Sequence, residues 1–183
     1  MTRVGERTDD FNLLRPKKKR VNSRTKGNAF ENKISKIFNT HFNTTDFMRT
    51  AGSGAFATTH NLPDHLKIYG DLITPQDFKF CIECKKGYNK ITITDFWKKN
   101  SELWKFIKKS ERDALYSKKQ SLVIWQQDNR DTLIILREDT ILNYPSLIHE
   151  PNVDFVTFNK YYLFKLEDLL KYTTRDFWFN QRY

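Results

Sequence analysis

A short run of alternating apolar and polar residues, 78–86, constrains this chain more than any other feature of its sequence. Because the side chains of a strand alternate between its two faces, the run predicts a β-strand with one apolar and one polar face. The apolar face would consist of Phe78, Phe80, Ile82 and Cys84, and the opposite face of Lys79, Cys81, Glu83 and Lys85. Glu83 and Lys85 therefore project side by side from one face of the predicted strand.

A second acidic residue lies on the run that precedes this strand. Residues 68–74 form an apolar, β-branched run around Asp71, and residues 74–77 (Thr-Pro-Gln-Asp) favour a tight turn because proline presets φ. The two runs predict neighbouring strands joined by a turn. Asp71 would then stand beside Glu83 and Lys85.

Two acids and a lysine in this arrangement point to a particular chemistry. Carboxylates that lie close repel each other, and a divalent cation removes the conflict. Oxygen ligands favour Mg²⁺, which binds one or two carboxylates and takes a further ligand from a substrate phosphate. Lys85 would position or deprotonate the attacking water and stabilise the developing negative charge. The residues thus indicate metal-assisted phosphodiester hydrolysis; the alternative is a solvated polar face on a two-stranded ribbon.

Charge is distributed unevenly along the 183 residues, a length typical of one domain. The formal net charge is +10, and its positive excess lies in residues 1–30 and 90–119, on either side of the acids. A polyanion held on both sides of an acidic centre fits this layout. The sequence has no 18-residue apolar stretch and no signal-peptide pattern, so membrane insertion and secretion are not expected.

The two cysteines, Cys81 and Cys84, are spaced C-x-x-C but would point to opposite faces of a strand. Zinc would need two more ligands, and His60 and His65 lack a finger spacing, so we favour free thiols over a zinc or redox site. Free thiols indicate a reducing, intracellular compartment.

Residues 1–25 are expected to form a flexible basic arm, because they show no hydrophobic periodicity. The arm would contact DNA phosphates through Lys17, Lys18, Lys19 and Arg20. The same basic run matches a nuclear-import signal, which is the less favoured interpretation.

A helix is expected over residues 27–39, with an apolar stripe made by Phe30, Ile34, Ile37 and Phe38. Glu31 lies at the border of that stripe. It is either an ordinary surface carboxylate or an acid that reaches over the sheet towards the metal.

A strand is expected over residues 46–51, followed by small residues up to Gly54. Arg49 and Ser53 would suit the close approach of a phosphate to the backbone. The loop that follows contains a Pro-Asp pair at Asp64, but we prefer Asp71 as the metal ligand because it belongs to a predicted strand.

A second helix is expected from Thr94 or Asp95 to about Ser110. Its apolar face would comprise Phe96, Trp97, Leu103, Trp104 and Ile107. A cluster on the opposite side, either solvated or in contact with DNA, would comprise Lys98, Lys105, Lys109 and Arg112.

The remaining chain predicts a hairpin of strands 121–126 and 132–137, a strand pair at 154–158 and 161–164, a helix at 166–172 and an aromatic tail at 177–179. No second domain boundary is evident, so residues 26–183 are expected to form one domain. The extension from about residue 126 would either enlarge the core or form a dimer surface.

Four short motifs in this order resemble the PD-(D/E)XK nuclease superfamily, and within it the archaeal and viral Holliday-junction resolvases. They are Lys-Gly-Asn-Ala-Phe-Glu at 26–31, Arg-Thr-Ala-Gly-Ser at 49–53, Asp-Leu-Ile at 71–73 and Glu-Cys-Lys at 83–85. Two departures stand out: Gly70 replaces the proline before the acid, and the C-terminal third has no counterpart in a minimal resolvase.

The resemblance implies an α/β, restriction-endonuclease-like core with a central mixed β-sheet flanked by helices. It implies that Asp71, Glu83 and the main-chain carbonyl of Cys84 hold Mg²⁺, with Mn²⁺ as a substitute. Lys85 would serve the attacking water, and Glu31 would orient a water or a second metal. Arg49 and Ser53 would contact the scissile DNA strand.

The expected function is therefore a homodimeric, structure-selective endonuclease that resolves four-way DNA junctions. A sequence-specific restriction-like or homing endonuclease of the same fold is one alternative. A DNA-binding protein without catalytic activity is the other, and the presence of all four polar site residues weighs against it.

Overall fold

A computed structural model describes residues 22–51 and 69–180 of the chain. In this part, a five-stranded mixed sheet has the order β3-β4-β5-β7-β6, in which β3 and β4 are parallel and the other neighbours are antiparallel. Its strands are β3 (Phe80–Lys86), β4 (Gln120–Gln126), β5 (Thr132–Arg137), β6 (Phe155–Phe158) and β7 (Tyr161–Lys165). The expected α/β fold with a central mixed sheet is confirmed.

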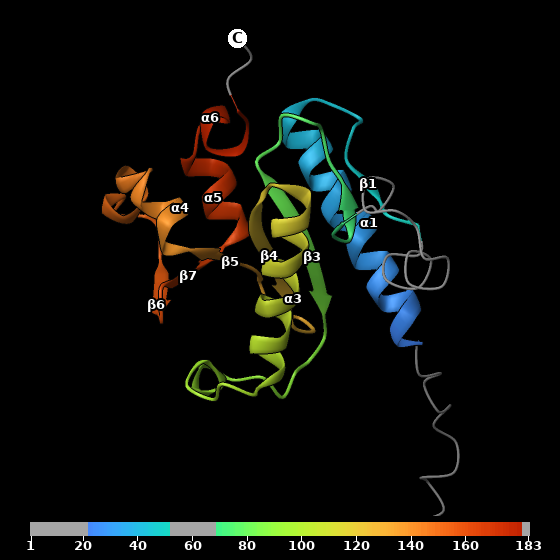
Figure 1. Cartoon of the computed structure of the whole chain (residues 1–183), viewed down its shortest axis with the longest axis vertical. Helices are drawn as coiled ribbons and strands as arrows, with labels where there is room; N and C mark the ends of the chain where they lie inside the picture. Colours follow the sequence, from blue (N-terminus) through green and yellow to red (C-terminus); the bar gives the residue numbers. More distant parts are fainter. Residues whose placement is uncertain (1–21, 52–68, 181–183) are drawn as a thin grey trace, which may run out of the picture.

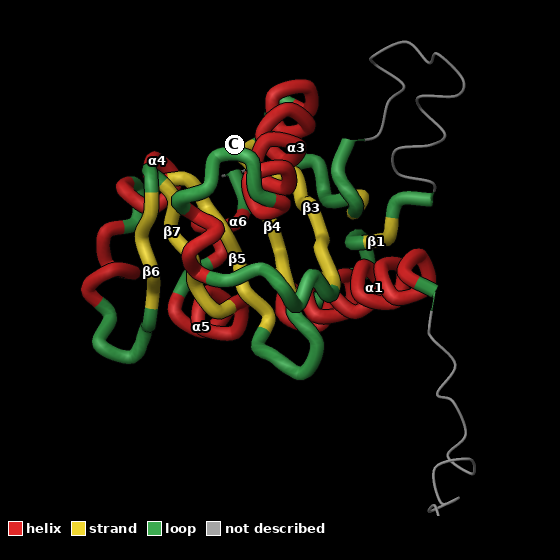
Figure 2. The backbone as a smooth tube through the Cα atoms, turned by 90° about the horizontal axis from the view of Figure 1, so that it is seen from below, coloured by secondary structure: helices red, strands yellow, loops and turns green. Residues whose placement is uncertain are grey.

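Helices cover both faces of this sheet. They are α1 (Ser23–Phe42), α3 (Glu102–Ser117), α4 (Glu138–Leu142), α5 (Leu166–Tyr172) and α6 (Arg175–Trp178), together with the 3₁₀ helices η3 (Ile93–Phe96) and η4 (Pro145–His149). Figure 2 shows α3 on one side of the sheet and α1 and α5 on the other. None of the helices in the described ranges is long and apolar enough to cross a membrane.

Two hydrophobic clusters, one on each side of the sheet, hold these layers together. On the α1 side, Phe30, Ile34 and Phe38 pack with Phe80 and Ile82 of β3, as the alternation of that strand predicts. The cluster on the α3 side contains Leu103, Phe106, Ile107, Val123 and Trp125. Strand β3 is therefore buried on both faces, which fixes its register.

Helix α1 begins earlier than the expected residue 27. The Asn22 side chain accepts a hydrogen bond from the Arg24 N–H at 3.0 Å and caps the helix, so the segment from Ser23 is helical and does not belong to a basic arm. The other end extends to Phe42, where Asn43 adopts a left-handed conformation with φ 52°.

The single helix expected from residue 94 is wrong, because this region contains two helical elements. The Ser101 hydroxyl donates to the Asp95 carbonyl at 2.9 Å and accepts from the Trp104 N–H at 3.5 Å, so it ends one element and caps the next. As a consequence Trp97, expected on the apolar face, is 70% exposed. Phe106 is buried instead.

The two strands expected before β3 are shorter than the sequence indicates. Strand β1 (Met48–Arg49) pairs antiparallel with β2 (Leu72–Ile73), and this ribbon is separate from the five-stranded sheet. The run at 68–74 still lies beside β3 as expected, because the Asp71 N–H donates to the Ile82 carbonyl at 2.8 Å.

The region after residue 126 continues the same sheet, so within the described chain it enlarges the core. The expected hairpin, the later strand pair and the helix at 166–172 are all present, whereas α4 and η4 had no counterpart among the expected elements. The aromatic tail is buried against α1 and the start of β3: the Trp178 carbonyl accepts from the Lys79 N–H at 2.8 Å, and Phe179 forms a β-bridge with Phe78. Figure 1 shows α6 near the top of the view, beside the segment that leads into β3.

Candidate active site

Strand β3 lies at the edge of the five-stranded sheet, and Asp71 is docked against that edge. In addition to its main-chain bond to Ile82, the Asp71 carboxylate accepts a hydrogen bond from the Cys84 N–H at 2.8 Å. The side chain is buried. The short segment before β2 thus covers the free edge and fixes an acid there.

Gly70 explains why the proline of the resembling family is absent. Its φ is +80°, which proline cannot adopt, and a Cβ at this position would lie 2.8 Å from the Ile82 carbonyl oxygen. Glycine therefore allows the close approach that brings Asp71 to the strand.

Glu83 projects from β3 towards α3 and is 1% exposed. Two ammonium groups bind its carboxylate: Lys85 contacts Oε1, and Lys109 of α3 contacts Oε2. The same lysines lie 3.7 Å and 4.0 Å from the two oxygens of Asp71. Two carboxylates and two lysines thus form one compact charged cluster.

Burial and mutual charge set the proton affinities in this cluster. Burial raises the pKa of Glu83, and the neighbouring Asp71 charge raises it further, while Lys85 and Lys109 oppose both effects. Burial alone would lower the pKa of Lys85, but the charges of Glu83 and Asp71 raise it above its ordinary value. The pKa of Lys109 is raised by the same two carboxylates against the effect of its burial. Both lysines are therefore held in the charged form.

Glu31 reaches this cluster from α1. Burial raises the pKa of its carboxyl group, and the charge of Asp71 adds to the effect. Its Oε2 atom is buried and makes no hydrogen bond to the described residues; the Arg49 Nη1 atom lies 3.8 Å from it. Glu31 therefore offers an acceptor oxygen that a bound water or cation can use.

Glu31, Asp71, Lys85 and Lys109 line an open pocket of about 640 Å³, which we name the catalytic pocket because it is the candidate site; the buried Glu83 binds two of these residues without lining the pocket itself. At its rim, Asp128 of the β4–β5 turn accepts hydrogen bonds from Lys26 at 2.7 Å and Asn89 at 2.9 Å, and Lys86 lies 3.7 Å away. The hydrogen bonds from Lys26 and Asn89 lower the pKa of Asp128 to about 2. The rim therefore consists of residues from the start of α1, the end of β3 and the β4–β5 turn.

The structure brings together four of the residues expected at the site, Glu31, Asp71, Glu83 and Lys85, with Arg49 beside Glu31. Of the other expected DNA contacts, Lys98 and Lys105 are exposed and pair with acids of their own segment. The expected contacts of the arm and loop, together with the alternative acid, lie outside the described residues: Lys17, Lys18, Lys19, Arg20, Ser53 and Asp64.

Lys109 was expected on the exposed lysine face, and that placement is wrong. It borders the buried stripe of α3 that contains Phe106 and Ser110, so it faces β3, and Asp113 one turn later holds it at 3.1 Å. Sequence reasoning also missed the rim. No local pattern indicates the rim, because it forms only when β3 and β4 pair in parallel and bring the end of β3 and the turn after β4 to the same end of the sheet.

Oxygen atoms dominate the donor set of the pocket. Both cysteines are free and buried, and the Cys84 carbonyl accepts from Lys85 at 3.2 Å. Across the described residues, no three His, Cys, Asp or Glu side chains form a metal-binding group. Asp71, Glu83 and the Cys84 carbonyl still fit Mg²⁺, because this ion accepts one or two protein carboxylates and completes its shell with water.

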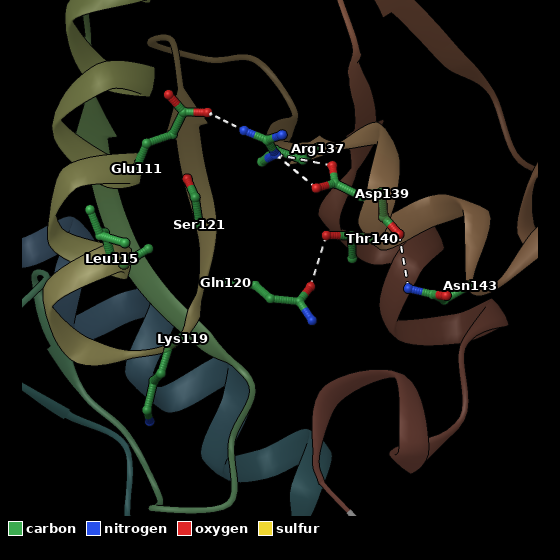
Figure 3. Close-up of a pocket in the computed structure, with 10 residues that line it drawn as sticks. Glu111, Leu115, Lys119, Gln120, Ser121, Arg137, Asp139, Thr140 and Asn143 are labelled. Carbon is green, nitrogen blue, oxygen red and sulfur yellow. Dashed lines mark hydrogen bonds and ion pairs between the residues drawn. The ribbon is translucent and has the colours of Figure 1, made fainter.

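A second pocket, of about 350 Å³, lies near the C-terminal end of α3 (Figure 3). Its Arg137 pairs with both carboxylates of the lining, Glu111 at 3.1 Å and Asp139 at 3.0 Å. Its Gln120 accepts from Thr140 at 2.8 Å. These pairings favour a structural role that ties α3 to α4.

A family model described as "phage putative PDDEXK endonuclease" matches residues 22–178. No curated protein and no solved structure matches the chain. The matched range contains the whole charged cluster.

Proposed function

Because the chain belongs to this family of phage PDDEXK endonucleases, we propose that it cleaves DNA by divalent-metal-dependent hydrolysis at the catalytic pocket. The observation that supports this most is the convergence of Glu31, Asp71, Glu83 and Lys85 at one edge of the sheet. The residues come from three separate segments, and a merely solvated polar ribbon would not gather and bury them.

Each residue has a role that its contacts support. Asp71, Glu83 and the Cys84 carbonyl would hold the cation, which supplies Lewis-acid polarisation of a phosphoryl oxygen when bound. Lys85, which is held in the charged form, stabilises the charge that develops on the phosphate as water attacks phosphorus and the bond to the leaving sugar oxygen breaks. The proton of the attacking water passes to solvent, and the leaving oxygen takes up a proton from solvent. The Glu31 Oε2 atom, which makes no hydrogen bond within the described residues, accepts one from that water. Arg49, which lies 3.8 Å from this oxygen, contacts the DNA strand being cut.

We propose Mg²⁺ as the physiological metal, with Mn²⁺ as a substitute, because the donors are all oxygen atoms. Removing divalent cations with EDTA should stop cleavage, and added Mg²⁺ should restore it. Cleavage that persists in EDTA would contradict the proposal.

The proposed substrate is branched DNA, above all a four-way junction cut by a homodimer whose two active sites share the junction's symmetry. The described part of the chain has no zinc finger or similar base-reading module, which favours recognition of shape and phosphates. A sequence-specific restriction-like or homing endonuclease remains the alternative.

We expect symmetric nicks in opposing strands of a four-way junction, and tighter binding of the junction than of a linear duplex of the same sequence at equal salt. The measurement compares junction, duplex and plasmid with Mg²⁺ present. Cleavage of one defined duplex site, with the junction ignored, would establish the alternative enzyme. Binding without any cleavage would indicate a DNA-binding protein without catalytic activity.

The two lysines of the cluster should contribute unequally. Lys85→Ala should lower the cleavage rate by a factor on the order of 10²–10³, because this ammonium is fixed by Glu83 and the Cys84 carbonyl. Lys109→Ala should lower it by about 10-fold, since Lys109 acts through the position of Glu83. Single-turnover rates would measure both effects.

Lys108→Ala provides the matched control, because Lys108 directly precedes Lys109 on α3 and is exposed. Its rate should stay close to that of the unmodified protein. An equal loss in all three variants would mean that the lysines act only through DNA affinity.

A further inference from the structure

Two neighbouring hollows of the structure share a wall formed by Tyr88 and Asn89. One is the catalytic pocket, and the other, which we name the side pocket, has a volume of about 570 Å³. Besides the shared wall, the side pocket is lined by Lys90, Ile91 and Lys98 among others, and its walls are mainly apolar. Its volume lies in the range of pockets that bind organic ligands, roughly 300–1,000 Å³.

Tyr88 is held in an unusual conformation at this wall. Its φ is +55°, a left-handed value that bulky side chains rarely adopt, and its side chain is 45% exposed. The ring packs edge-on against Phe106, with centroids 4.7 Å apart. Strained residues of this kind persist only where the surrounding structure fixes them, and they cluster at ligand-binding sites.

The turn that carries Tyr88 is held by hydrogen bonds to residues at the end of β4 and just after it. The Gly87 N–H donates to the Gln126 carbonyl at 2.8 Å, and Trp125 Nε1 donates to the Gly87 carbonyl at 3.2 Å. Gln127 donates to the Ile91 carbonyl at 2.8 Å. An exposed ring on a fixed turn is a preorganised surface for a flat partner.

The Tyr88 ring lies close to Lys85, where the DNA strand would be cut. Phe106 lies between Tyr88 and Lys85, whose ammonium is 5.6 Å from the Phe106 centroid. The Tyr88 ring is therefore within about three nucleotide steps of Lys85, at roughly 3.4 Å per nucleotide of a duplex strand. Lys90 and Lys98 line the side pocket together with Asp95 and Glu102, and Lys98 pairs with Asp95 at 3.3 Å. The formal charges of the lining therefore balance, which suits an uncharged base rather than a phosphate.

We propose that the side pocket binds an unpaired base of the DNA strand being cut, with Tyr88 as the stacking partner. A base inside a duplex is stacked on both sides, whereas an unpaired base can leave the stack and pack on an aromatic side chain. The substrate class is therefore DNA with an unpaired nucleotide within about three positions of the scissile phosphate, as at a flap, a bulge or a branch point whose base pairs have opened. This inference rests on the proposed nuclease function and adds a reason for shape selectivity.

The test measures binding in EDTA, so that it does not depend on cleavage. Probes are a perfect duplex and the same duplex with an unpaired 2-aminopurine in a bulge or at a branch. Tyr88→Ala should weaken binding of the unpaired probes by about 5- to 150-fold and leave the affinity for perfect duplex unchanged. It should also remove the quenching of 2-aminopurine fluorescence that stacking on Tyr88 produces.

Three further variants make the result specific. Tyr88→Phe keeps the ring and should bind as the unmodified protein does. Tyr88→Gly accepts the left-handed φ freely and should reproduce the alanine result if the turn stays folded. Tyr116→Ala removes an exposed tyrosine of α3 that stacks on Tyr69 away from the side pocket, and it should have no effect.

Equal affinity of the unmodified protein and Tyr88→Ala for the unpaired probes would overturn this inference and leave the nuclease proposal intact. Equal loss of affinity for duplex and unpaired probes would also overturn it, because Tyr88 would then serve general DNA binding. Failure of the unmodified protein to bind or cut any DNA would overturn the nuclease proposal as well.

Discussion

Glu83→Gln is expected to abolish DNA cleavage while DNA binding persists or becomes tighter. The substitution keeps the shape of the side chain but removes a charged oxygen that would hold the cation and that binds Lys85 and Lys109. The loss should be on the order of 10³ or more in rate. Loss of one negative charge reduces repulsion of the phosphates, which explains why binding should not weaken.

Cleavage would be measured with Mg²⁺ present, and binding by gel shift in EDTA. Asp71→Asn should behave in the same way, since its amide oxygen can still accept from the Cys84 N–H. Glu102→Gln is the matched control, an exposed glutamate at the start of α3, and should retain full activity. Full activity of Glu83→Gln with Mg²⁺ would disprove the metal site.

Trp178→Ala is expected to lower the free energy of unfolding by about 3–5 kcal/mol, the range for a large aromatic residue lost from a core. The side chain is 0% exposed and its ring packs against Phe38, Phe78 and Phe80. Its Nε1 atom donates to the Thr173 hydroxyl at 2.8 Å, so the substitution also leaves an acceptor unpaired. Urea unfolding followed by circular dichroism would measure the loss.

Trp97→Ala is the matched control for this experiment, because Trp97 is exposed. It should change the free energy of unfolding by no more than about 0.5 kcal/mol. Similar losses in the two variants would show that the aromatic tail is not part of the core.

Local patterns predicted the parts of the fold that depend on neighbours in sequence. The alternation around Glu83 gave the two faces of β3, and the spacing of Phe30, Ile34 and Phe38 gave the buried stripe of α1. The turn at Asn159 and Lys160, both with positive φ, separates the expected β6 and β7. In these cases the period of the apolar residues decides which side chains are buried.

Contacts between distant segments could not be predicted in the same way. Lys109 faces Glu83 because α3 crosses the polar side of β3, and the helix pattern alone allows either orientation of a lysine at the border of the stripe. Asp128 reaches the rim only because β4 runs parallel to β3. The glycine at position 70, which departs from the family pattern, is explained only by the three-dimensional structure, through its positive φ and its close approach to Ile82.

The order in which the chain is synthesised gives the bond between Lys79 and Trp178 a further consequence. Besides the bond between Lys79 and Trp178, the Asn180 N–H donates to the Asp77 carbonyl at 2.8 Å, so residues 178–180 hold the start of β3. These residues leave the ribosome much later than β3 itself. At roughly 5–20 residues per second, that segment follows β3 by roughly 5–20 seconds. A nascent chain therefore carries both acids before the sheet edge that orients them is complete. We expect cleavage to begin only after the aromatic segment has emerged and bound the start of β3.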